Sequence, residues 1–86
     1  MSLEEKLSEE LDGLKRIRDE LQVKIHLGKA EANELWERSE QKIEEVESKL
    51  KFISEQAEQP LHDVREAAKM LLGEISDGYK RIRDAL

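Results

Sequence analysis

The feature that most constrains this 86-residue chain is a stripe of apolar or small residues that recurs with helical spacing. Its members follow one another by three, four or seven positions, which keeps them on one side of an α-helix. The stripe consists of Leu3, Leu7, Leu11, Leu14, Leu21, Ile25, Gly28, Ala32, Leu35, Ser39, Ile43, Val46, Leu50, Ile53 and Ala57. The pattern predicts an all-α protein that begins with one long helix, over about residues 2–57.

The composition agrees with long helices rather than with a core built around large rings. Charged residues make up 42% of the chain and aromatic residues only 3%, so the core has to be built from Leu, Ile, Val and Ala. Abundant Glu, Lys and Leu are typical of long helices and coiled coils. A chain of this length forms one domain at most, and we expect a single helical domain over residues 1–86.

Pro60 marks the clearest break in the pattern. Proline removes a backbone donor inside a helix but fits the first position of a new one. We therefore predict a turn near 57–60 and a second helix over about 60–85, with a kinked continuous helix as the alternative. The apolar stripe of this second helix is Leu61, Val64, Ala68, Leu71, Ile75, Tyr79, Ile82 and Leu86.

Gly28 is a weaker break, because the stripe keeps its phase across it from Leu21 to Leu35. A continuous first helix that folds back on the shorter second helix gives an antiparallel helical hairpin. This hairpin leaves the stripe of residues 3–29 uncovered, and an exposed apolar stripe is an association surface. We therefore expect a homodimer. The residues expected to carry self-association are Leu7, Leu11, Leu14, Leu21, Val23, Ile25 and Leu27.

The alternative fold is an up-down-up three-helix bundle that is broken at Gly28 and Pro60. Its helices would lie near residues 3–27, 29–57 and 60–86. Charge does not separate the two arrangements. The basic block 15–29 can face the acidic residues of 31–40 in the same chain or the acidic block 4–12 of a second chain.

A ten-residue segment occurs twice in the chain. Residues 12–21 read DGLKRIRDEL and residues 77–86 read DGYKRIRDAL, with eight of ten positions identical. Each copy suits a turn of amphipathic helix, with its isoleucine inside and its charges outside. The two copies supply a candidate basic patch of Lys15, Arg16, Arg18, Lys80, Arg81 and Arg83. Flanking acidic blocks and a net charge of −6 argue against a nucleic-acid partner.

No constellation of residues points to catalysis or to a metal. The chain has no cysteine, and no phosphate-binding loop or nucleophile motif occurs. His26 lacks a ligand partner four residues away. His62 has Glu58 and Glu66 at this spacing, but Glu58 lies before Pro60 and the Glu-x-x-His spacing of di-iron bundles is absent. We therefore expect no enzymatic activity, no cofactor and no metal site.

The hydrophobic pattern also bears on the membrane. No run approaches the roughly 18 apolar residues that span a bilayer, and the N-terminus lacks the features of a signal peptide. We expect a cytoplasmic protein without a transmembrane segment. Peripheral membrane contact stays open, because amphipathic helices such as those of exchangeable apolipoproteins can lie on lipid.

Two stretches carry a resemblance. Residues 18–37, RDELQVKIHLGKAEANELWE, and residues 71–86, LLGEISDGYKRIRDAL, resemble small bacterial proteins of unknown function that are predicted to be wholly helical. The resemblance implies a bacterial, cytoplasmic, all-helical protein and brings no activity or site with it. The sequence thus predicts a self-associating helical module that binds protein, with a lipid-binding amphipathic protein as the alternative.

Overall fold

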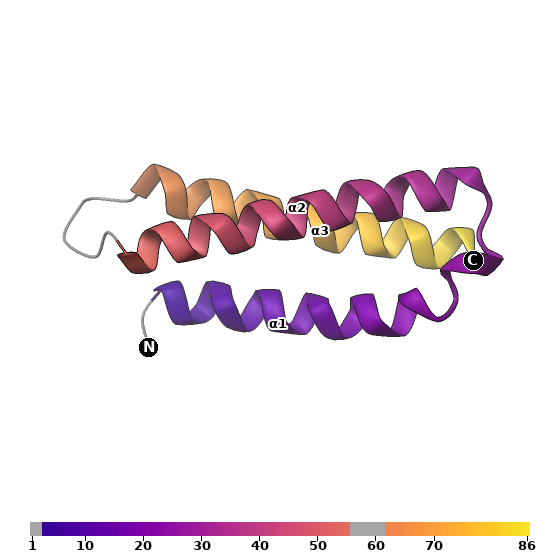
Figure 1. The fold of residues 1–86 in the computed structure, drawn as a ribbon, viewed down its shortest axis with the longest axis horizontal. Coiled ribbons are helices and arrows are strands. Elements are labelled where there is room, and N and C mark those ends of the chain that lie inside the picture. Colours follow the sequence, from indigo (N-terminus) through magenta and orange to yellow (C-terminus); the bar gives the residue numbers. More distant parts are fainter. Residues whose placement is uncertain (1–2, 56–61) are drawn as a thin grey trace.

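The computed structural model describes residues 3–55 and 62–86, and within these ranges the chain is all-α. Helix α1 spans Leu3–Gln22, α2 spans Ala30–Glu55 and α3 spans His62–Ala85. A single 3-10 turn, Ile25–Leu27, lies in the connection between α1 and α2 (Figure 1). The prediction of an all-α helical bundle is confirmed.

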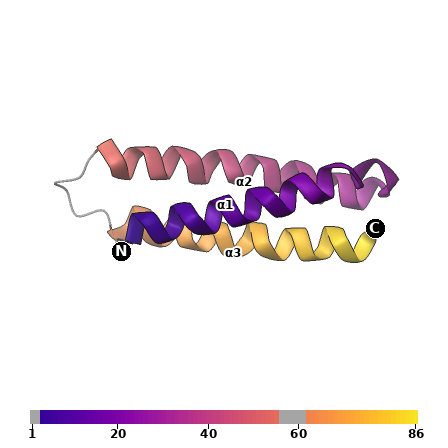
Figure 2. The ribbon, with the colours of Figure 1, turned by 90° about the horizontal axis from the view of Figure 1, so that it is seen from below.

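The three helices lie side by side in an elongated bundle of 46 × 20 × 16 Å. Helices α1 and α3 run in the same direction and α2 runs between their ends in the opposite direction (Figures 1 and 2). Helix α2 packs along α3, and α1 packs on both. The chain therefore reverses between Glu55 and His62, which excludes a kinked continuous helix, although the turn predicted at Pro60 lies outside the described residues.

The prediction of one long helix over residues 2–57 is wrong, because α1 ends at Gln22 and α2 begins at Ala30. The up-down-up alternative describes the chain. Breaking the helix lets α1 fold back, so that its stripe is buried by α2 and α3 of the same chain. Burying one leucine stabilises a fold by roughly 1.5–3 kcal/mol, whereas a backbone hydrogen bond contributes only about 0.5–1.5 kcal/mol. Several buried leucines therefore outweigh the few helical bonds lost at the break.

The core is a single apolar cluster that all three helices share. Its buried members include Leu7, Leu11, Leu14 and Leu21 from α1, Ile43 and Val46 from α2, and Ala68, Leu72, Ile75, Tyr79 and Ile82 from α3. In α3 the fully buried leucine is Leu72, while Leu71, which the predicted stripe contained, is only partly buried.

The two copies of the repeated segment lie on α1 and α3 and end at the same end of the bundle (Figure 1). Leu14 and its counterpart Tyr79 are both buried, and Ile82 is buried while its counterpart Ile17 is partly buried. Leu21 is buried, but its counterpart Leu86 is 41% exposed. The repeat therefore supplies two parallel helices, both packed on α2, whose apolar faces match except at the last position.

Candidate functional site

The candidate site is an exposed apolar surface at the connection between α1 and α2. Val23 and Leu27 keep 69% and 72% of their surface accessible, the highest values among the large apolar side chains described. Leu86 is 41% exposed and lines the same hollow as Leu27. We call the set Val23, Ile25, Leu27 and Leu86 the apolar tip.

The backbone of this connection is wound by short-range hydrogen bonds. The amide of Lys24 donates to the Leu21 carbonyl, that of Leu27 to Lys24, and that of Gly28 to Ile25, each at 2.9 Å. Bonds of this i to i−3 type give the tight 3-10 winding that often ends an α-helix. The winding turns Val23 and Leu27 toward solvent, while Ile25 packs partly against the core.

Gly28 is required where the connection passes α2. A Cβ atom at this position would lie 2.9 Å from the Ala32 Cβ and 3.1 Å from both the Ile25 carbonyl oxygen and Leu86 Cδ2. Only glycine fits this close approach without displacing its neighbours. Gly28 therefore helps to hold the tip against the N-terminal turn of α2.

Charges of both signs surround a shallow hollow of about 280 Å³ beside the tip. Its lining includes Glu20, Lys24 and Arg83 as well as Leu27 and Leu86. Arg83 Nη2 lies 3.9 Å from Glu20 Oε2, which links α3 to α1 at this end. The rim of the tip is thus neither purely acidic nor purely basic.

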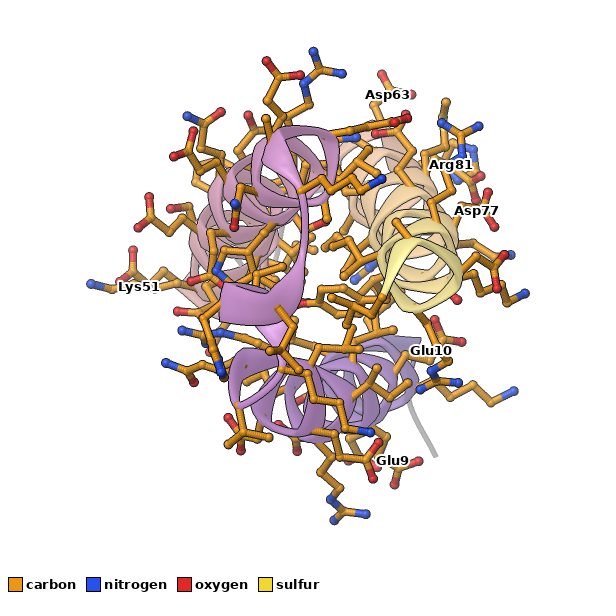
Figure 3. The ribbon with its side chains drawn as sticks, turned by 90° about the vertical axis from the view of Figure 1, so that its right-hand side faces the viewer. Glu9, Glu10, Lys51, Asp63, Asp77 and Arg81 are labelled. Carbon is orange, nitrogen blue, oxygen red and sulfur yellow. The ribbon has the colours of Figure 1, made fainter. Side chains whose placement is uncertain are left out.

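Several charged side chains away from the tip point outward from the bundle. Figure 3, which looks onto the tip end, shows Glu9 and Glu10 of α1, Lys51 of α2, and Asp77 and Arg81 of α3 directed outward. These residues place charges of both signs around the outside of the bundle.

The structure divides the seven residues that the sequence assigned to self-association. Leu7, Leu11, Leu14 and Leu21 are at most 8% exposed, because α2 and α3 of the same chain cover them. The uncovered stripe on which the dimer prediction rested does not exist in this arrangement. Of the seven, only Val23 and Leu27 are exposed, and Ile25 is partly buried.

Three of the six residues of the candidate basic patch pair with carboxylates of the same chain. Lys15 Nζ lies 2.8 Å from Glu47 Oε1, and Arg18 Nε lies 2.7 Å from Glu40 Oε1. Arg83 reaches Glu20 as described above. For Arg16, Lys80 and Arg81, the described residues offer no ion-pair partner within 4.0 Å. Half of the patch is therefore paired with carboxylates of the same chain.

Sequence reasoning missed a polar cluster where the three helices meet. The Tyr79 hydroxyl is buried and has no hydrogen-bond partner among the described residues. Burial, with a further contribution from the Glu40 carboxylate, raises the pKa of Tyr79 well above its ordinary value. The phenol therefore stays protonated at neutral pH and cannot act as a base. Its ring lies 6.3 Å from that of Trp36, tilted by 37°.

Metal-binding and membrane-spanning features were sought in the same ranges. Over residues 3–55 and 62–86, no group of three or more His, Cys, Asp or Glu side chains could hold a metal ion. His26 lies in the 3-10 turn and His62 is the first residue of α3. None of the described helices is long and apolar enough to cross a bilayer.

Comparison with known proteins gives no match among family models, curated proteins or solved structures. The resemblance to small bacterial helical proteins therefore stays a prediction, and the function has to be argued from the site.

Proposed function

We propose that this chain is a non-enzymatic, self-associating helical module that binds protein through the apolar tip. The observation that carries the proposal is the joint exposure of Val23 and Leu27 in one short connection. Single exposed apolar residues are common on protein surfaces. Here Leu27 also shares a hollow with Leu86, and an apolar cluster rimmed by polar groups is characteristic of interaction sites.

The charges around the tip favour a second copy of the same chain as the partner. In a two-fold symmetric contact, each surface has to be complementary to itself. The rim of the tip carries the acidic Glu20 together with the basic Lys24 and Arg83. Each copy can therefore present a base to the acid of the other while the apolar residues meet between them.

Sedimentation velocity over a range of concentrations tests this proposal. We expect the wild-type chain to associate as concentration rises, and the double variant Val23→Ser/Leu27→Ser to stay monomeric. Met70→Ser is the matched control, because Met70 is 67% exposed but lies on α3, away from the tip. A wild-type chain that is monomeric throughout, or a double variant that associates as the wild type does, would contradict the proposal.

Lipid binding is the competing function, and flotation with vesicles separates it from protein binding. The apolar faces of the described helices are packed against one another, so the bundle has to open before they can lie on a membrane. We expect the chain to stay in solution with both zwitterionic and anionic vesicles. Flotation with either would favour the lipid-binding alternative.

A further inference from the structure

The connection between α1 and α2 is a helix interruption that its own sequence does not enforce. Residues 23–27 read VKIHL and contain none of the Gly, Pro, Asn, Asp or Ser residues that usually build turns. Gly28 is the one turn-forming residue before α2. The apolar stripe also keeps its helical phase through the connection, from Leu21 through Ile25 and Gly28 to Ala32 and Leu35.

The backbone of the connection is close to helical already. Lys24, which precedes the 3-10 turn, has φ −107° and ψ −13°, in the right-handed helical region. Gly28, which follows the turn, has φ −79° and ψ 155°, so that its ψ alone is far from helical. No described residue has a positive φ. Of Lys24 and Gly28, only Gly28 has to change its ψ for the connection to become helical.

From these observations we infer that two copies of this chain associate by exchanging α1. In the exchanged dimer, α1 and α2 of each copy form one helix from Leu3 to Glu55, and α1 packs on α2 and α3 of the other copy. The inference rests on the proposed self-association and gives it a different mode, in which α1 is exchanged instead of two closed copies meeting at their apolar tips. Domain exchange is a low-cost route to a dimer, because each exchanged element re-forms the contacts that it had within its own chain.

The contacts of α1 define where the two copies cross. In the monomeric three-helix arrangement of Figure 1, which we call the closed chain, α1 runs antiparallel to α2. Ion pairs join Lys15 to Glu47 and Arg18 to Glu40. The sequence midpoint between Lys15 and Glu47 is residue 31, and that between Arg18 and Glu40 is residue 29. When the same pairs form between copies, the two-fold axis passes near residue 30. Small residues lie on either side of this point, at Gly28 and Ala32, and let two helices approach closely.

Exchange re-covers the leucines of α1 but leaves two residues of the connection exposed. In the closed chain Val23 and Leu27 are exposed to solvent. In a continuous helix they stay exposed, because a step of two residues turns an α-helix by roughly 200° and places them on the face away from Leu21 and Ile25. The buried leucines Leu7, Leu11, Leu14 and Leu21 would then be covered by the second copy.

Two substitutions shift the equilibrium between the closed monomer and the exchanged dimer in opposite directions. Gly28→Ala places a Cβ against Ala32 in the closed chain but favours an uninterrupted helix. Because each of two chains gains helix propensity, we expect the dissociation constant of the dimer to fall about 30-fold. Ala30→Pro fits the first position of α2 in the closed chain but breaks a continuous helix. We expect this variant to weaken the dimer at least about 100-fold.

Sedimentation equilibrium measures both effects, with circular dichroism to establish that each variant is folded. Gly73→Ala is the matched control, because it adds the same methyl group in helix α3, where a Cβ meets nothing within 4 Å. It should leave the dissociation constant unchanged within about threefold. Dimers of Gly28→Ala and Ala30→Pro that are as stable as the wild-type dimer would overturn the exchange.

Cross-linking distinguishes exchange from the docking of two closed copies. The chain contains no cysteine, so Lys15→Cys/Glu47→Cys places two thiols on facing surfaces of α1 and α2. A short bis-maleimide should give covalent dimers from the dimer fraction and internally linked chains from the monomer fraction. Only internal links in the dimer fraction would overturn exchange and leave self-association intact. A wild-type chain that never dimerises would contradict both.

Discussion

Arg18 on α1 and Glu40 on α2 bring Nε and Oε1 to 2.7 Å beside the buried hydroxyl of Tyr79 on α3. The Nε–H bond of Arg18 does not point at the carboxylate oxygen, so the contact is not a hydrogen bond. The attraction between the two side chains is that of their opposite charges. The two contacting atoms are buried, while about a third of each side chain as a whole remains accessible to solvent. The pair joins α1 to α2 where both helices meet α3.

The unpartnered hydroxyl of Tyr79 predicts that Tyr79→Phe stabilises the bundle. Phenylalanine keeps the packing against Trp36 and removes a buried donor that has no partner among the described residues. We expect the free energy of unfolding to rise by about 1 kcal/mol, as measured by urea denaturation. A fall of similar size would show that the hydroxyl makes a stabilising bond.

The same residue predicts how stability depends on alkaline pH. The folded-state pKa of Tyr79 lies above its unfolded value of about 10. Its contribution is therefore fully present below pH 10 and is lost as pH rises, because only the unfolded state releases the proton readily. Tyr79 is the only tyrosine, so phenolate absorbance reports it directly.

We expect the absorbance of the folded chain to titrate well above pH 10, and the loss of stability between pH 10 and 11 to be smaller in Tyr79→Phe. A phenol that titrates near its ordinary pKa in the folded chain would contradict this placement.

Leu11 and Leu27 should respond very differently to truncation, although the sequence placed both in one association surface. Leu11 is 5% exposed in the core and Leu27 is 72% exposed. Leu11→Ala should lower the free energy of unfolding by about 2–4 kcal/mol, while Leu27→Ala should change it by less than about 0.5 kcal/mol. Thermal and urea unfolding at low protein concentration measure both. Equal losses would contradict the closed bundle.

Gly78 lets helix α3 lie close to Ser39 of α2, because glycine has no Cβ atom. A Cβ at Gly78 would lie 2.9 Å from Ser39 Oγ, whereas a Cβ at Gly13 meets nothing within 4 Å. Gly13→Ala should therefore stabilise the chain by about 0.5–1 kcal/mol, and Gly78→Ala should destabilise it by about 1 kcal/mol. Adding Ser39→Ala should recover most of that loss. If Gly78→Ala is as stabilising as Gly13→Ala, the helices do not approach as described.

The sequence predicted which faces are buried better than it predicted what covers them. Leu7, Leu11, Ile43 and Val46 all lie in the core, as the stripe requires. Periodicity states that a helix face avoids water, but it does not identify the neighbouring helix. The break after Gln22 was missed because the apolar stripe keeps its helical phase across residues 23–27, although Val23 and Ile25 are β-branched and have low helix propensity.

The candidate site could be predicted only in part. Val23 and Leu27 were among the residues assigned to self-association, and their exposure follows from a 3-10 turn that periodicity does not reveal. The contact of Arg18 with Glu40 next to Tyr79 depends on the register of three helices. No pattern within a single helix contains that information.

Small-angle X-ray scattering over a concentration series tests the central claim. The claim is that residues 23–29 form a folded-back connection in the monomer and part of one continuous helix in an exchanged dimer. At low concentration we predict a particle of monomer mass with a radius of gyration close to the 14.0 Å of the Cα atoms. At high concentration we predict twice that mass and an elongated particle built on helices of about 80 Å, the length of residues 3–55 at 1.5 Å per residue. An elongated particle at monomer mass would contradict the account.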